Sequence, residues 1–251
     1  MKWYTEVSFK VRLKIESVIT LSFLYLKQKS RCHMNRAEED YIKTIYELTI
    51  EKKQPLIKAN ELSERFGYSD QSVNEMIKKL VKKHLVSFVP YKGVSLTSKG
   101  KDVAIRMVRA HRIWEVFLTE KLGFSWDEVH EDAEMLEHAT SKHVLEKLYH
   151  FLGEPKYCQH GNPIPDFKNH MAEVAVQSLD QLKVGETFEV LRVLDFKELL
   201  LYLNEQNIKL HDYLNIIEKD EFNGIMTILC NNQRKTMSIK TAKMIFGRIK
   251  K

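Results

Sequence analysis

The chain has 251 residues, of which 43% are hydrophobic, and this is enough material for two or three compact domains. Its formal net charge of +6 suits a polyanionic partner. Three cysteines without disulfide-like spacing argue against a disulfide-stapled secreted protein and indicate a reducing cytoplasm.

The first 33 residues differ in character from the rest. Their apolar run, 18–26, is too short to span a bilayer and is interrupted by two hydroxyl side chains. The small-residue cleavage site of a signal peptide does not follow it, and basic residues close it. We therefore expect residues 1–33 to be an upstream extension of the reading frame that is not part of the fold, with the working protein beginning near Met34.

The next stretch predicts a helix-turn-helix. A first helix, which Pro55 ends, carries apolar residues at helical spacing: Tyr41, Ile45 and Leu48. A second, short amphipathic helix stops at Gly67, and a third begins at Ser69 or Asp70. The third helix should face inward through Val73, Ile77, Leu80 and Val81. Two helices joined by a turn of three or four residues that contains Gly form this motif.

The stretch VSFVPYKGVSLTSKG alternates apolar and polar residues and is typical of a β-hairpin, the wing of a winged helix. A winged helix also serves protein contacts, but lysines cluster here where phosphates would lie, which favours DNA. The expected contacts to bases and phosphates are Ser69, Gln71, Ser72, Asn74, Glu75, Lys78, Lys79 and Lys92.

A long helix is predicted over 98–122, ended by Gly123. One stripe on it is long and apolar enough to pair with a second protomer: Val103, Met107, His111, Trp114 and Leu118. Two more helices and the turn-rich loop EPKYCQHGNPIP follow. From about Ala172 the pattern changes, and short strands are expected in VGETFEVLRVL, DYLNIIEKDEFNGIMTILCN and KTMSIKTAKMIF. One helix in DFKELLLYLNEQ interrupts them, and the pattern indicates a small SH3-like β-barrel.

The segment SWDEVHEDAEMLEHATSKH concentrates potential metal ligands. Four of them share one helix face at positions i, i+4, i+7 and i+8: His130, Glu134, Glu137 and His138. A solvated surface is the ordinary interpretation of such a face. Further candidates lie nearby in the sequence: His111, Glu115, Cys158 and His160. Mixed nitrogen and oxygen ligands with one sulfur suit a divalent transition ion, and this many buried carboxylates need a cation.

Several motifs of this chain resemble those of a known family. The motifs EDYIKTIYEL, SVNEMIKKL, YKGVSLTSKG, AHRIWEVFL, WDEVHEDAEMLEH, CQHGNPIP and VLDFKELLLYL occur in the order found in the diphtheria toxin repressor family of metal-dependent transcriptional regulators. The manganese-responsive branch is the more similar one. The resemblance spans nearly all of 34–251, and residues 1–33 lie outside it.

The resemblance implies two metal sites per subunit. One would join Asp40, Glu134, Glu137 and His138. The other would join His111, Glu115, His130, Cys158 and His160, reached by Asp195, with Glu198 as a weaker candidate. In the iron-responsive branch a methionine and a cysteine resemble the positions of Asp40 and Glu134, so the oxygen ligands here suit Mn²⁺. Cys158 keeps Fe²⁺ and Zn²⁺ as alternatives. Some manganese regulators have a glutamate where this chain has Lys43, which argues against a second Mn²⁺ bridged there.

The sequence therefore predicts a mainly α fold in three domains. These are a winged helix-turn-helix over 34–97, a helical dimerisation and metal-binding domain over 98–170, and an SH3-like, FeoA-type barrel over 171–251. The expected function is that of a cytoplasmic repressor of metal-uptake genes, with no membrane partner. It would bind an inverted-repeat operator in double-stranded DNA as a homodimer.

Three alternative functions are weighed against this one. The first is an iron-responsive regulator of the same family, and the second is a winged-helix protein that binds DNA without sensing metal. The third is an enzyme, because HEDAE resembles a zinc metalloprotease helix. That chemistry needs two histidines four residues apart, and Glu134 occupies the second position. We therefore expect no enzymatic activity.

Overall fold

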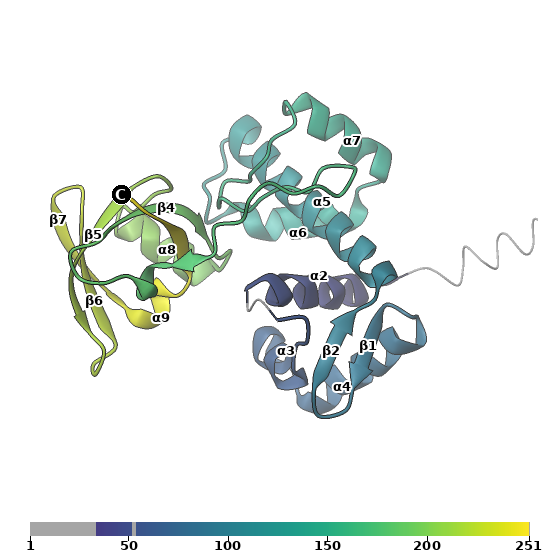
Figure 1. Ribbon diagram of the computed structural model, residues 1–251. Helices are drawn as coiled ribbons and strands as arrows, with labels where there is room; N and C mark the ends of the chain where they lie inside the picture. Colours follow the sequence, from purple (N-terminus) through teal and green to yellow (C-terminus); the bar gives the residue numbers. More distant parts are fainter. Residues whose placement is uncertain (1–33, 52–53, 251) are drawn as a thin grey trace, which may run out of the picture.

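The computed structural model describes residues 34–51 and 54–250, so the expected upstream extension lies outside the described residues. Its first part is a winged helix (Figure 1). The elements are α2 (Arg36–Glu51), α3 (Ala59–Phe66), α4 (Asp70–Lys82), β1 (Val86–Val89) and β2 (Gly93–Leu96). The strands β1 and β2 form the antiparallel hairpin that the sequence predicts.

Local sequence signals set the ends of the two helices of the helix-turn-helix. Gly67 ends α3 in the left-handed conformation, with φ 67°. The Ser69 hydroxyl caps α4 by accepting a hydrogen bond of 3.3 Å from the backbone N–H of Ser72. The prediction for Val81 is wrong, because 37% of it is exposed. It lies in the last turn, beside the buried stripe that ends at Leu80.

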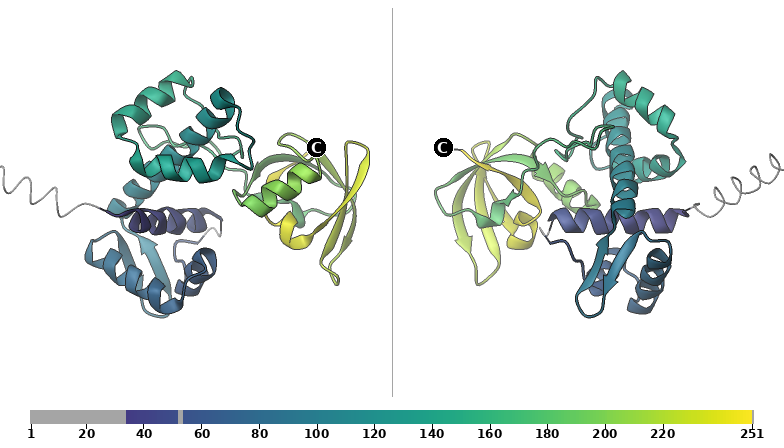
Figure 2. Two further views of the ribbon diagram at one scale, coloured as in Figure 1. Left: turned by 180° about the vertical axis from the view of Figure 1, so that it is seen from behind. Right: turned by 45° about the vertical axis from the view of Figure 1, so that its right-hand side comes forward.

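The second part is helical and consists of α5 (Ser98–Leu122), α6 (Val129–Ala139) and α7 (Lys142–Phe151). The long helix α5 connects the parts: its first half completes the hydrophobic core of the winged helix, and its second half packs on α6 and α7 (Figures 1 and 2). Met107, His111 and Leu118 are buried within the chain. The stripe expected to face a second protomer is therefore used internally, because α5 has neighbours on several sides.

The third part is an antiparallel sheet. Its strands are β3 (Gln177–Ser178), β4 (Thr187–Val193), β5 (Tyr213–Asp220), β6 (Ile225–Cys230), β7 (Gln233–Ser238) and β8 (Ile245–Ile249). Their order is β3-β8-β4-β5-β6-β7. Three short helices accompany them: η1 (Leu179–Gln181), α8 (Lys197–Glu205) and α9 (Ile239–Ala242). Leu199, Leu200 and Leu203 of α8 belong to the core of this part.

The predicted closed barrel and mainly α class need correction. No pairing joins β3 to β7 among the described residues, so the SH3-like sheet stays open. Residues expected to extend a strand form α9 instead, and Ser238 caps this helix by accepting from the Thr241 N–H at 2.9 Å. Since α9 contacts β6, β7 and η1, it fills the space between the two edges of the sheet. The fold as a whole mixes α and β structure.

None of the described helices combines the length and the apolar character needed to cross a bilayer.

A tight turn in the loop after α7 attaches the helical part to the sheet. The Gly161 N–H donates to the Cys158 carbonyl at 2.9 Å, and the Val193 N–H donates to the His160 carbonyl at 3.0 Å. A Cβ atom added to Gly161 would collide with the Leu191 carbonyl of β4. Only glycine therefore permits this approach of loop and strand.

Gly161→Ala should destabilise the protein more than Gly123→Ala, although both glycines have φ 77°. Each variant carries a conformational cost of about 1 kcal/mol. Gly161→Ala adds a steric cost on the order of 1–3 kcal/mol, whereas a Cβ at Gly123 meets nothing within 4 Å. Urea unfolding of both variants measures the difference, and equal losses would contradict the steric role.

Candidate metal centre and DNA-binding face

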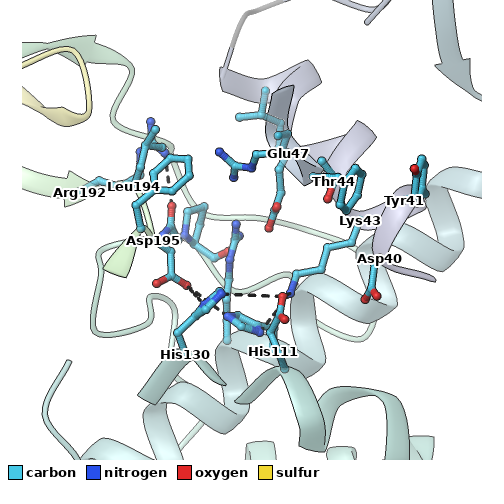
Figure 3. Close-up of a pocket in the computed structure, with 18 of the residues that line it drawn as sticks. Asp40, Tyr41, Lys43, Thr44, Glu47, His111, His130, Arg192, Leu194 and Asp195 are labelled. Atoms are coloured by element: carbon cyan, nitrogen blue, oxygen red, sulfur yellow. Dashed lines mark hydrogen bonds and ion pairs between the residues drawn. The ribbon is translucent and has the colours of Figure 1, made fainter. Parts of the chain in front are cut away.

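The candidate ligands meet where the three parts of the chain join. A cavity of about 380 Å³ lies between α2, α5, α6 and the segment that leads from β4 to α8. Figure 3 shows Asp40 and Lys43 approaching it from α2, and Asp195 reaching toward His130 and His111 from the opposite side. The centre is therefore a junction between parts rather than a site within one of them.

The first ligand group joins α2 to α6 and consists of Asp40, Glu137 and His138. His138 Nε2 lies 2.9 Å from Asp40 Oδ1 and 3.6 Å from Glu137 Oε1. Asp40 is the only member of the group from the winged helix. A cation held by this group would connect the winged helix directly to the helical part.

The second group gathers around His111 on α5 and includes Glu115, His130 and Asp195. His111 Nε2 lies 3.1 Å from Glu115 Oε1 and 3.2 Å from Asp195 Oδ2. His130 Nδ1 lies 2.9 Å from the same Asp195 oxygen. Asp195 thus brings the sheet part of the chain into the centre, as the family resemblance implies.

A third group shares Glu115 with the second and adds the loop residues Cys158 and His160. His160 Nδ1 lies 3.0 Å from Glu115 Oε1 and 3.7 Å from Asp195 Oδ1. Both Cys158 and His160 are buried. Because the second and third groups share Glu115 and both approach Asp195, we treat them as one candidate site with alternative ligands.

Outer contacts orient two of the histidines. Glu39 Oε2 lies 2.8 Å from His138 Nδ1, and Glu39 is itself paired with Arg106 at 2.6 Å. An Nδ1–H of His138 would therefore donate to Glu39 and leave Nε2 for a cation. The Trp126 carbonyl lies 2.8 Å from His160 Nε2, so an Nε2–H would donate to it and leave Nδ1, which faces Glu115, to bind a cation. Sequence reasoning missed Glu39 and Trp126, because neither has ligand spacing, although Glu39 directly precedes Asp40.

The carboxylates of the centre keep the histidines protonated. Burial alone would lower the pKa of His138, but contacts with Asp40 and Glu39 and the charge of Glu137 raise it to about 9. Burial and Lys43 likewise oppose protonation of His111, yet Glu115, Glu137 and Asp195 raise its pKa well above 6.5. The pKa of His160 is raised for the same reason, with Glu115 as the main counter-charge.

The acids and the thiol respond in opposite directions. Burial would raise the pKa of Glu115, but His160 and His111 outweigh it and lower that pKa to about 2. Burial would also raise the pKa of Asp195, but the charge of His160 and the contacts with His111 and His130 outweigh burial and hold this pKa well below its usual value. Burial and the charge of Glu115 raise the pKa of Cys158, so this thiol ligates only when a cation compensates the lost proton.

Several atoms of the centre fit a divalent ion. Asp40 Oδ1, His138 Nε2 and Asp195 Oδ1 are buried and make no hydrogen bond within the described residues, although Asp40 Oδ1 and His138 Nε2 lie 2.9 Å apart as an ion pair. Buried polar atoms without hydrogen bonds are costly, and a cation in the first group together with one at the second candidate site would satisfy them. The donor set of carboxylates, imidazoles and one thiol is that of a divalent transition ion.

Two predicted ligands lie apart from these groups. Glu134 is 37% exposed, and its Oε1 lies 3.6 Å from Lys43 Nζ and 3.8 Å from His130 Nε2. It belongs to none of the three ligand groups found among the described residues. Glu198, the weaker candidate, is exposed in the first turn of α8 and also lies outside these groups.

The proposed DNA contacts lie on α4 and the wing. Five of them are exposed: Gln71, Ser72, Glu75, Lys78 and Lys92. Asn74 is half-buried. Ser69 is exposed but caps α4, and Lys79 pairs with the buried Glu38 at 3.0 Å, so both have structural partners as well. This face therefore presents mixed polar and basic side chains at the start of the second helix of the motif.

Comparisons with known proteins agree with this architecture. Family models for iron dependent repressors match their N-terminal DNA binding domain to residues 33–94 and their metal binding and dimerisation domain to residues 97–166. A model of the FeoA domain matches residues 177–249. The three matches follow one another along the chain without overlap.

Individual relatives point the same way. The iron-dependent repressor IdeR of Mycobacterium leprae is 34% identical over 127 residues, which are 51% of this chain. The match covers about half of that relative's own length, 54%. The diphtheria toxin repressor of Corynebacterium efficiens is 30% identical over 67% of this chain and 74% of its own.

A solved structure of the manganese regulator SloR is 35% identical, covers 85% of this chain and 98% of its own, and has a TM-score of 0.76. The chain therefore belongs to the diphtheria toxin repressor family of metal-dependent transcriptional regulators.

Proposed function

We propose that this protein is a transcriptional repressor that binds DNA when a divalent metal ion, with Mn²⁺ preferred, occupies the candidate centre. One observation carries the proposal. Asp40 of the winged helix lies with Glu137 and His138 of α6 in one ligand group, whose donor atoms are within 4.8 Å of one another. The names of the relatives, which are repressors and a manganese regulator, support the same conclusion.

The residues of the chain explain how such a switch works. When bound, the ion supplies a compact double positive charge that several anionic and imidazole groups share. Asp40 would then hold α2 against α6, and α2 carries the rest of the winged helix with it through their common core. Only the conformation in which all the ligands reach the ion gains the full free energy of metal binding. The difference in metal affinity between this conformation and the others therefore determines how strongly the ion shifts the protein toward it.

The grouping of the candidate ligands supports two sites per chain. The Asp40 site would use Asp40, Glu137 and His138, with Glu134 able to join by a change of rotamer. The Glu115 site would draw on His111, Glu115, His130, Cys158, His160 and Asp195. Carboxylates dominate and favour Mn²⁺, whereas the thiol of Cys158 favours Fe²⁺ or Zn²⁺ at the second site.

A homodimer on an inverted-repeat operator completes the proposal. Large apolar side chains are exposed on the helical part and offer a surface for a second copy: Leu122, Met135, Val144 and Phe151. Two-fold symmetry would place two winged helices on half-sites about one helical turn apart. In this proposal the DNA-binding, dimerisation and FeoA-type domains occupy 34–97, 98–170 and 171–251, and the target genes serve metal uptake.

Asp40→Ala should leave the protein folded but weaken Mn²⁺-stimulated DNA binding by on the order of 10- to 100-fold, because the variant loses the α2 ligand. Asp102→Ala, which removes an exposed carboxylate from α5, is the matched control. Fluorescence anisotropy with labelled operator DNA, with and without Mn²⁺, measures the effect. A full metal response in Asp40→Ala would exclude the bridge between α2 and α6.

Metal binding should release protons at pH 7. His138, with a pKa of about 9, must lose its proton before Nε2 can bind an ion, and the raised pKa values of His111 and His160 act in the same direction. Calorimetric titration with Mn²⁺ in buffers of different ionisation enthalpy counts these protons. Identical heats in all buffers would mean that the histidines are already neutral.

The raised pKa of His138 determines how the stability of the metal-free protein changes with pH. A histidine with a raised folded pKa stabilises the chain fully below its unfolded value of 6.5 and loses this effect as pH rises through 9. The chelated, metal-free protein should therefore unfold at a lower temperature at pH 9.5 than at pH 6.5. His138→Asn should flatten this dependence, and an unchanged slope in the variant would assign it to other groups.

The recognition helix separates base contacts from phosphate contacts. Glu75 is exposed on α4 and can accept a hydrogen bond from cytosine N4. Glu75→Ala should relax the preference at one base pair per half-site by roughly 1–3 kcal/mol. Lys78→Ala should weaken binding to all DNA sequences by a similar factor. It should also reduce the slope of log affinity against log salt concentration by about 1. Anisotropy titrations on mutated operators test both, and equal losses on every sequence would mean that another face enters the groove.

A further inference from the structure

Glu38 of α2 is a buried carboxylate whose partners belong to the helix proposed to contact DNA. The residue is 0% exposed. Its Oε1 lies 3.0 Å from Lys79 Nζ, and its Oε2 lies 2.7 Å from Lys83 Nζ. A carboxylate that is removed from water is costly unless positive charge is held against it. Glu38 therefore needs the ammonium groups of these two lysines.

The start of α2 fixes the carboxylate in this position. The Asn35 backbone N–H donates to Glu38 Oε2 at 3.0 Å, and the Glu38 N–H donates to Asn35 Oδ1 at 3.0 Å. Reciprocal bonds of this kind form a capping box. Because the box holds the Glu38 side chain in the first turn of α2, the acid cannot follow the lysines into solvent, and the lysines must come to the acid.

The lysines at the end of α4 divide between two faces of the helix. Lys78 and Lys82 lie four residues apart and are exposed on the face that begins with the proposed DNA contacts. Lys79 and Lys83 also lie four residues apart, on the neighbouring face that turns toward α2. Their side chains are 47% and 29% exposed, so both ammonium groups would turn into solvent if Glu38 carried no charge.

Lysine charges that are free on a recognition helix strengthen binding to DNA of any sequence. Each ammonium that neutralises a phosphate releases counterions and adds about 0.9 to the slope of log affinity against log salt concentration, here called the salt slope. This attraction needs neither base contacts nor a fixed spacing of two winged helices, so a metal-free protein has it as well. A metal-dependent repressor leaves DNA more completely without its metal when this attraction is weak.

We propose that Glu38 withholds the charges of Lys79 and Lys83 from DNA phosphates and so limits the affinity of the protein for DNA of arbitrary sequence. Lys79, which the sequence places among the DNA contacts, is then chiefly a partner of Glu38, and Lys78 and Lys82 supply the phosphate contacts of α4. This inference rests on the proposed function and deepens it. Glu38 is a positioning residue, because it acts through the lysines that it holds.

Glu38→Gln removes the charge but keeps the length of the side chain and an oxygen that can accept from the Asn35 N–H. In the chelated, metal-free protein it should steepen the salt slope by about 1 to 2. It should also raise the affinity for a labelled duplex of arbitrary sequence on the order of 10-fold at low salt. Glu64→Gln, at an exposed position of α3, makes the same change in net charge and should leave the salt slope as it is. Fluorescence anisotropy at several salt concentrations measures both quantities.

Lys79→Ala shows whether the released charge is the one that Glu38 held. In the wild-type background it should reduce the salt slope much less than Lys78→Ala does, because the Lys79 ammonium is already paired. In the Glu38→Gln background it should reduce the salt slope by about 1, the contribution of one phosphate contact. Thermal unfolding of each metal-free variant records the cost to stability separately from the effect on DNA binding.

A salt slope in Glu38→Gln equal to that of the wild type overturns the inference, even if the variant is less stable, since a purely structural role would lower stability alone. Equal reductions by Lys79→Ala and Lys78→Ala in the wild-type background also overturn it, because Lys79 would then already contact phosphate. Failure of the wild-type protein to bind the duplex at low salt, with or without Mn²⁺, instead overturns the proposed function and this inference with it.

Discussion

Negative charge gathers at the junction of α2, α5, α6 and the segment after β4, and the contacts among the three parts of the chain form around it. Carboxylates from three parts of the chain approach one another there, among them Asp40, Glu115, Glu137 and Asp195, and such a cluster repels itself unless positive charge is held between its members. In the metal-free chain that charge comes from Lys43 and from histidines whose pKa values the same carboxylates raise. A divalent ion would replace protons at these positions, so metal sensing becomes a competition between two kinds of cation for one set of ligands.

The junction matters for DNA because α2 belongs to two contact networks. Glu38, two residues before Asp40, is buried and pairs with Lys83 at 2.7 Å and with Lys79 at 3.0 Å. Lys79 lies on α4 and Lys83 directly follows it, so a shift of α2 moves the recognition helix as well. Two ion pairs of Glu38 therefore link the helix of the candidate ligand Asp40 to the end of α4, the helix proposed to contact DNA.

The sheet part takes part in the same junction. Arg65 of α3 lies over the Phe196 ring at 4.2 Å, next to Asp195, and α8 is held to the first turn of α6 by the ion pair of Lys197 and Glu131 at 2.7 Å. Asp195 thus has its backbone fixed from two sides. Besides its covalent connection to the helical part, the third part contacts the winged helix directly, beside the cavity that the candidate ligands line.

Features that depend on neighbours in the sequence were predictable. The ends of α3 and α5 at Gly67 and Gly123, the hairpin and the shared face of His130, Glu137 and His138 follow from local rules. Features that depend on distant partners were not. The side chain of Glu134 faces Lys43 instead of Asp40, and the predicted strand at 239–242 is a helix because it fills the open sheet edge.

The position of Lys43 shows the limit most clearly. The sequence identifies it as a departure from the family pattern, but only the packing of α2 on α5 and α6 places its ammonium between Glu137 and His111. Glu39 was missed for the same reason, since its partner His138 lies 99 residues away.

In the proposed switch, a divalent ion fixes the winged helix against the helical part. Spin labels at exposed positions 92, on the wing, and 142, at the start of α7, report the distance between these parts by double electron–electron resonance. The diamagnetic ion Zn²⁺ can be added without disturbing the labels. We expect a broad distance distribution in the chelated protein that becomes narrow when Zn²⁺ is added and stays broad in Asp40→Ala. The same distribution with and without the ion in the wild-type protein would contradict it.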